Sequence, residues 1–188
     1  MAETITLLRR DHVSFALLLS ALLRQAERAE NGKPPSVELV KLILIYFRDY
    51  LRKIHHPKEE MLYNLLAACA PEQASKCHSA IAEHRALTDR LRPLEMAIAA
   101  LSPHEKDSLQ GFAAEARSFI EDEDRHINEE EGHLYPSAVH RLSVADWERI
   151  DTLTANDATP VFGEDAVRPF NTLKDEILAL EATLAHLQ

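Results

Sequence analysis

The chain has 188 residues, of which 46% are hydrophobic, and 31 Asp and Glu against 21 Lys and Arg give a formal net charge of −10 at pH 7. This length suits one domain, and an acidic chain without a basic stripe is not expected to bind nucleic acid. No stretch reaches the roughly 18 uninterrupted apolar residues of a membrane span, and the N-terminus lacks the apolar segment of a signal peptide. We therefore expect a cytoplasmic protein with no membrane partner. Cys69 and Cys77 are too few for a disulfide framework or a zinc ribbon, and we expect free thiols.

The composition favours an all-α fold, since only 4 glycines and 9 prolines punctuate a chain rich in Leu, Ala and Glu. Apolar residues return every three or four positions in four long stretches, which predict helices over residues 4–29, 36–69, 72–100 and 103–139. Ser36 is expected to cap the second helix, and Ser102-Pro103 to open the fourth. Short breaks between long helices predict antiparallel neighbours, and hence an up-down-up-down four-helix bundle over residues 1–142.

Residues 143–188 are expected to form a helical extension packed on the bundle. Two shorter helices are predicted at 144–153 and 171–187, joined by an irregular segment over 156–169. Large aromatic side chains bury the most surface per residue. Three of them are the expected anchors of this extension: Trp147, Phe162 and Phe170.

Polar residues interrupt the apolar stripe of each long helix. Each helix places one histidine in its stripe, and the second and fourth helices add a glutamate one turn later. Two carboxylates facing a core need a cation or another partner, and imidazole with carboxylate suits one or two iron or manganese ions in a bundle. Each piece alone is also typical of a core histidine bonded to a carbonyl, or of a surface His/Glu pair. The predicted metal ligands are His12, His55, Glu59, His84, His126 and Glu130.

The second helix contains two competing pairs one turn apart, His55/Glu59 and His56/Glu60. His55 follows the apolar stripe, whereas His56 shares its face with mostly polar residues. Because successive residues lie about 100° apart around an α-helix, the stripe favours His55 and Glu59 as ligands and places His56 on the outside. Pro57 is expected to kink this helix or to divide it into two pieces.

Residues near the predicted ligands are assigned lesser roles. Glu123, one turn before His126, is expected to orient that imidazole from the edge of the site, and His133 is a weaker candidate for a supporting role. The acidic runs around them are typical of solvated helix faces. Four histidines fall outside the stripes and are expected to be solvated: His78, His104, His140 and His186.

These motifs together resemble the hemerythrin-like HHE cation-binding family. The matching pieces are Asp11-His12, the run His-His-Pro-Lys-Glu-Glu at 55–60, Glu83-His84, and the run from His126 to Pro136. Residues 146–151 and 161–163 also resemble the C-terminal part of a bacterial subgroup, so the resemblance covers nearly the whole chain.

The resemblance implies two non-haem iron ions joined by an oxygen or hydroxide bridge, with Glu59 and Glu130 bridging them and His12, His55, His84 and His126 as terminal ligands. Another divalent metal can take the place of iron in crystals. Oxygen-carrying members have a histidine pair on the third helix, but the neighbours of His84 at that spacing are Ala80 and Thr88. One ion would then keep an open position, which puts pure oxygen transport in doubt.

The expected function is binding or sensing of O2, peroxide or nitric oxide at this centre. An enzymatic alternative is turnover of peroxide or nitric oxide, or repair of iron–sulfur clusters, for which an open coordination position is required. A further alternative is a structural bundle with zinc or without metal. The sequence indicates neither an oligomeric state nor a redox partner.

Overall fold

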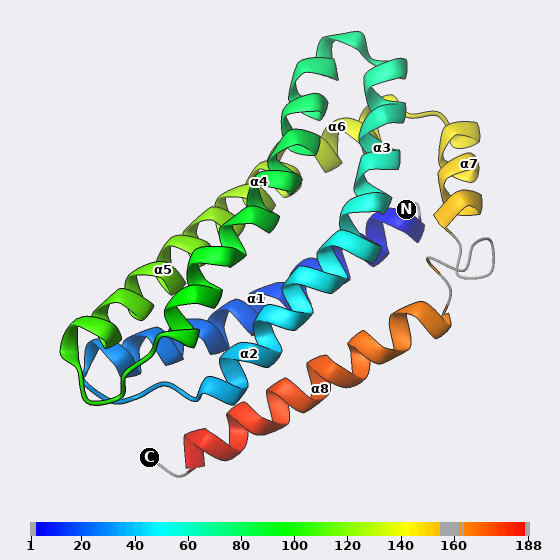
Figure 1. Cartoon of the computed structure of the whole chain (residues 1–188). Coiled ribbons are helices and arrows are strands. Elements are labelled where there is room, and N and C mark those ends of the chain that lie inside the picture. Colours follow the sequence, from blue (N-terminus) through cyan, green and yellow to red (C-terminus); the bar gives the residue numbers. More distant parts are fainter. Residues whose placement is uncertain (1–2, 155–161, 163, 187–188) are drawn as a thin grey trace.

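The computed structural model describes residues 3–154, 162 and 164–186, and these residues contain no strand. Four long helical segments lie side by side, and their order along the chain makes an up-down-up-down bundle (Figure 1). The all-α bundle predicted from the sequence is confirmed. The segments are α1 (Glu3–Glu30); α2 (Val37–Tyr46), η1 (Phe47–His55) and α3 (His56–Cys69); η2 (Pro71–Gln73) and α4 (Ala74–Ala99); and α5 (Lys106–Glu129), η3 (Glu130–Leu134) and α6 (Tyr135–Arg141).

One of the two predicted helix starts is confirmed. The Ser36 hydroxyl accepts a hydrogen bond from the Leu39 amide at 3.3 Å and caps α2. The start at Ser102-Pro103 is wrong, because α5 begins only at Lys106. The Ser102 amide donates instead to the Ser108 hydroxyl at 2.8 Å, a bond that holds residues 101–105 as a loop.

Two π-helical segments, η1 and η3, lie within the second and fourth long helices. The His56 amide donates to the Leu51 carbonyl and the Tyr135 amide to the Glu130 carbonyl, each five residues back. A proline stands in the first turn of the α-helix that follows each of them, at Pro57 and Pro136. Since proline has no N–H and is tolerated in a first turn, each helix continues through the proline without a break.

The C-terminal helices pack against the bundle. Helix α7 (Val144–Thr154) contacts α1 and α3, and α8 (Glu164–His186) runs beside α2 and α1 (Figure 1). The irregular segment expected to extend to residue 169 is wrong in its last part, because α8 begins at Glu164 and contains Pro169. Acidic residues in the first turn favour this earlier start, since they face the positive end of the helix dipole.

The three aromatic anchors of the extension all contact the bundle. Trp147 is half-buried against the apolar cluster around α3 and α6. Phe162 is 5% exposed, and Lys58 Nζ of α3 lies over its ring, 5.3 Å from the centroid. Phe170 on α8 packs edge-on against Tyr46 and Tyr50, with ring centroids 6.3 and 5.3 Å away. Half of the expected irregular segment, residues 156–161 and 163, lies outside the described residues.

The apolar core is divided into two clusters with a polar layer between them. On α1, Leu8 belongs to one cluster and Phe15 to the other, and His12 lies between them. The fourth long helix repeats this arrangement, with Phe119 and Leu134 on either side of the polar layer. The polar residues that interrupt the four apolar stripes therefore lie at the same height along the bundle axis. None of the helices in the described part of the chain combines the length and the apolarity that a membrane crossing requires.

Candidate metal centre

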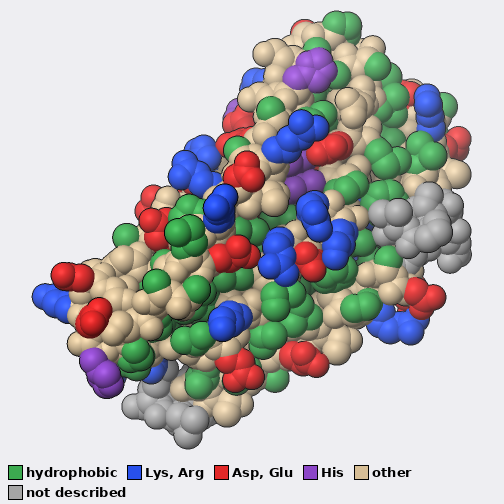
Figure 2. Space-filling model, viewed as in Figure 1, with side chains coloured by type: hydrophobic (Ala, Val, Ile, Leu, Met, Phe, Trp, Pro, Cys, Tyr) green, Lys and Arg blue, Asp and Glu red, His purple; other side chains and the backbone are tan. Residues whose placement is uncertain are grey.

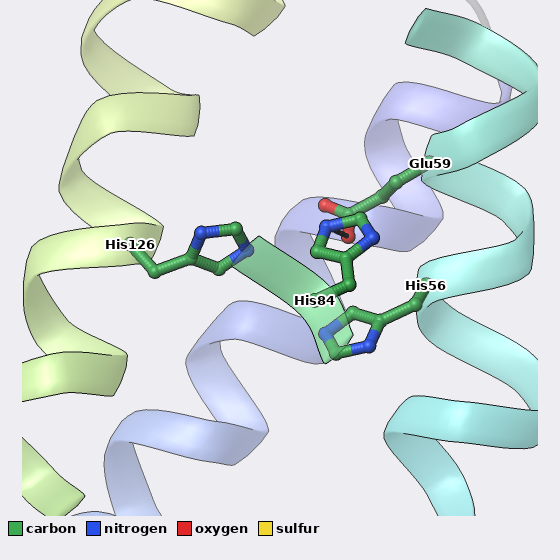
Figure 3. Close-up of side chains that lie close together, drawn as sticks. All are labelled: His56, Glu59, His84 and His126. Atoms are coloured by element: carbon green, nitrogen blue, oxygen red, sulfur yellow. Dashed lines mark ion pairs between the residues drawn. The ribbon is translucent and has the colours of Figure 1, made fainter. Parts of the chain in front are cut away.

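The six residues predicted as ligands are brought together in this layer, and each is 5% exposed or less. Donor atoms of these six residues and of His56 form two groups, each with four atoms within 4.8 Å of one another, and Glu59 belongs to both. Figure 3 shows the whole first group, with side chains from α3, α4 and α5 pointing toward one another. The first group is His56, Glu59, His84 and His126, and the second is His12, His55, Glu59 and Glu130.

Each of the two carboxylates reaches both groups. Glu59 places Oε1 3.3 Å from His55 Nε2 and Oε2 3.4 Å from His84 Nε2. Glu130 places Oε1 3.2 Å from His126 Nε2 and Oε2 3.4 Å from His12 Nε2. One oxygen of each carboxylate thus faces each group, which is the arrangement required to bridge two cations.

Several donor atoms at the centre are buried without a hydrogen-bond partner among the described residues. They are Glu59 Oε2, Glu130 Oε2, His84 Nε2 and His126 Nε2. An unpartnered buried polar atom is costly, and carboxylates with imidazoles are a donor set for divalent metal. The residues present therefore fit a metal centre.

The outer nitrogen of each predicted histidine ligand contacts a carboxylate. His12 Nδ1 lies 3.0 Å from Glu131, His55 Nδ1 3.3 Å from Asp11, His84 Nδ1 3.4 Å from Glu60, and His126 Nδ1 3.2 Å from Glu83. Such a partner fixes the ring and makes its other nitrogen a better metal donor. All four imidazoles therefore present Nε2 to the centre.

The expected supporting roles of Glu123 and His133 need correction. Glu83 on α4 pairs with His126 Nδ1, the role expected of Glu123, because α4 packs directly against α5. Glu123 is nevertheless 1% exposed, and burial raises its pKa to about 7. His133 points outward and lies 3.2 Å from Glu129.

The prediction that His56 lies on an outer, polar face is wrong. His56 is 4% exposed, and its ring stacks on that of His84 with centroids 3.9 Å apart and planes 2° from parallel. The π-turn of η1 is the physical reason, because its additional residue changes the register that an uninterrupted α-helix would have. A fifth imidazole therefore joins the centre, as a member of the first group. The sequence signal was Pro57, directly after the histidine pair.

The histidines expected to be solvated are exposed wherever their side chains are described, at His78, His104 and His140. The side chain of His186 lies outside the described residues. Cys69 and Cys77 are free thiols, as expected.

The charges around the centre favour protonated imidazoles as long as no metal competes. Burial alone disfavours an imidazolium, but the hydrogen bonds that His12 donates to Glu130 and Glu59 raise its pKa to about 10. Burial also lowers the pKa values of His55 and His126, but the neighbouring carboxylates outweigh it and raise both values to about 9. Burial and the adjacent His84 lower the pKa of His56.

The metal-free protein is therefore expected to lose stability as the pH rises. Histidines with folded pKa values raised above the unfolded value of about 6.5 stabilise fully below that pH, and the contribution disappears through the folded values of about 9 to 10. Urea unfolding of chelator-treated protein should give a smaller free energy of unfolding at pH 9.5 than at pH 6.5. The His133→Gln variant, which changes an exposed histidine, should show the same loss. A free energy independent of pH over this range would contradict the assigned charges.

A surface pocket of about 470 Å³ reaches the centre between α3 and α4. His56 and His84 form part of its wall, and its other lining residues are Arg52, Pro57, Glu60, Arg85, Thr88 and Asp89. The face shown in Figure 2 carries recessed histidine side chains near its middle, bordered by side chains of both charges. Small molecules can therefore approach the first group from solvent.

Comparison with known proteins gives one family match. The hemerythrin HHE cation-binding domain matches residues 3–138, which include all the residues of both ligand groups. No curated protein matches the chain, and no solved structure does.

Proposed function

Because this chain belongs to the hemerythrin HHE cation-binding family, we propose that it holds two non-haem iron ions and binds or senses O2, peroxide or nitric oxide with them. Cation binding follows from the family and from the two ligand groups. The observation that carries the proposal of two ions is the placement of Glu59 and Glu130, each with one oxygen toward each group.

The donor set supports iron over a structural zinc ion. Structural zinc sites are closed tetrahedra of four ligands, rich in thiolate, whereas neither cysteine belongs to the two groups found among the described residues. Two carboxylates shared between two imidazole-containing groups are typical of the di-iron and di-manganese centres of helix bundles. When bound, iron would supply the redox chemistry.

The chain would supply a dry, rigid setting for that chemistry. Phe15 packs edge-on against His55 with centroids 4.7 Å apart, and Phe15 and Phe47 are each 1% exposed or less. Apolar walls exclude water and thereby strengthen the electrostatic influence of the ligands and their carboxylate partners. The free thiols of Cys69 and Cys77 suit a reducing compartment, which supports a place in the cytoplasm.

The test is iron content. Protein loaded with ferrous iron under anaerobic, reducing conditions and then desalted should retain about two ions per chain by elemental analysis. Its optical and electron paramagnetic resonance spectra should change on exposure to O2, peroxide or nitric oxide. Retention of less than about half an ion per chain would refute the proposal, and preferential retention of a single zinc ion from a mixed supply would favour the structural alternative.

The pocket beside His56 and His84 favours a second candidate, enzymatic turnover of peroxide or nitric oxide, because it is large enough to admit and release small molecules. Repair of iron–sulfur clusters belongs to the same class. Continuous consumption of peroxide or nitric oxide in the presence of a reductant would favour the enzyme, whereas one stoichiometric spectral change would favour binding or sensing.

A further inference from the structure

Two buried tyrosines contact the carboxylates at the centre. Tyr63 lies on α3 and Tyr135 opens α6, and both are 0% exposed. Each belongs to one of the two helices that carry a carboxylate and follows that carboxylate by about one turn. Their hydroxyls are the only uncharged side-chain donors to Glu59 and Glu130 among the hydrogen bonds of the described residues.

The two hydrogen bonds cross between the helices. The Tyr135 hydroxyl donates to Glu59 Oε1 at 2.5 Å, and the Tyr63 hydroxyl donates to Glu130 Oε1 at 2.7 Å. Tyr63 also lies near the glutamate of its own helix, but at the longer distance of 3.5 Å from Glu59 Oε1. Each tyrosine therefore braces the carboxylate supplied by the opposite helix.

Each tyrosine also serves a different ligand group. The oxygen that Tyr135 contacts is the Glu59 oxygen facing the second group, and the Tyr135 ring stacks on His12 with planes 4° from parallel. The oxygen that Tyr63 contacts is the Glu130 oxygen facing His126 in the first group. One phenol is thus assigned to each ion position.

We propose that Tyr63 and Tyr135 are positioning residues, one for each ion, which orient the bridging carboxylates and reduce the negative charge that these carboxylates donate to the metal. The inference rests on the proposed di-iron function and adds that the two phenols influence the reduction potential of the iron ions. A hydrogen bond to an ionised carboxylate is short and strong, and it withdraws electron density from the oxygen that accepts it. An ion bound to a weaker donor favours its lower oxidation state, so the two phenols raise the potential.

The phenols are suited to remain donors. Each hydroxyl is buried beside an oxygen of an ionised carboxylate, which can only accept a hydrogen bond, so the phenol is the donor. Tyr46 provides a matched control within the same bundle. It is 2% exposed, but it stacks on Tyr50 at 5.1 Å in the other apolar cluster, and no hydrogen bond or ion pair of the described residues joins it to the two ligand groups.

The experiment uses iron-loaded full-length Tyr63→Phe, Tyr135→Phe, the double variant and Tyr46→Phe. Phenylalanine removes only the hydroxyl, and circular dichroism should show unchanged helix content. Each single variant should keep its iron and shift the midpoint potential to lower values, and the double variant should shift it further. The potential of Tyr46→Phe should stay at that of the wild type. Loss of one ion in a centre variant, but not in Tyr46→Phe, would also support a positioning role.

Two results would overturn the inference. A double variant with two ions and an unshifted potential would show that the phenols do not influence the metal. An equal shift in Tyr46→Phe would show a general effect of removing a buried hydroxyl. Both leave the proposed function intact, whereas wild-type protein without iron would overturn the proposed function and this inference with it.

Discussion

The His56→Ala variant is expected to hold about one iron ion per chain where the wild type holds about two. Its imidazole is one of three in the first ligand group, and its stacking on His84 holds both rings in the core. Alanine would leave that group with His84, His126 and shared carboxylate oxygens. Loss of one ligand typically costs orders of magnitude in affinity, since coordination depends on ligand number and geometry. Elemental analysis after desalting measures the outcome.

Three further variants make this test specific. His55→Ala should lose the ion of the second group instead, and Glu59→Ala should lose both ions, because its carboxylate belongs to both groups. His133→Ala should keep both, since that side chain is exposed and pairs with Glu129. Full iron content in His56→Ala, with loss only in His55→Ala, would show that His55 is a ligand and His56 is not, as the helical stripe predicted.

Removal of the metal is expected to lower the melting temperature by roughly 8–16 °C. A ligand present at about a thousand times its dissociation constant stabilises the folded state by about 4 kcal/mol. For a chain of this size, each kcal/mol corresponds to roughly 2–4 °C. Every long helix places at least one residue in the two groups, so metal-free protein would also gather five buried, mutually close imidazoles and two carboxylates without their cation.

Scanning calorimetry of iron-loaded and chelator-treated protein at pH 7 measures this difference. The Glu59→Ala variant is the control, since chelator should change its melting temperature little. Equal melting temperatures of loaded and stripped wild-type protein would show that bound protons stabilise the buried imidazoles and carboxylates as well as metal does.

Much of this fold and the location of its centre could be predicted because both follow from helical periodicity. A stripe that returns every 3.6 residues fixes which side chains face the core. His12 is an example, since its place between Leu8 and Phe15 predicted its burial without knowledge of the other helices. The same reasoning placed His84 in the core. Identification of these residues as metal ligands remains a prediction.

The remainder depends on contacts between segments distant in sequence or on departures from the α-helix. His56 is buried because η1 widens the helix just before it. A constant rotation of about 100° per residue does not describe a π-turn, so the burial of His56 could not be predicted from the stripe. Glu83 and Glu131 pair with histidines of other helices, so spacing within one helix could not reveal them. The later start of α5 depends on the Ser108 side chain, six residues beyond the amide it binds.

The π-turns η1 and η3 also rotate one end of the second and of the fourth long helix about the helix axis relative to the other end. A turn closed by bonds five residues back contains one residue more than an α-helical turn, an offset of about 100° for all that follows. The α2 half of the second helix can therefore pack in its apolar cluster while the α3 half sets the angle of its ligands independently. Insertion or deletion of one residue within 47–55 would change none of the residues on the two flanking apolar faces. It would nevertheless rotate His55 and Glu59 away from their partners. Chain length in the middle of this helix is consequently as tightly constrained as the identity of the ligands.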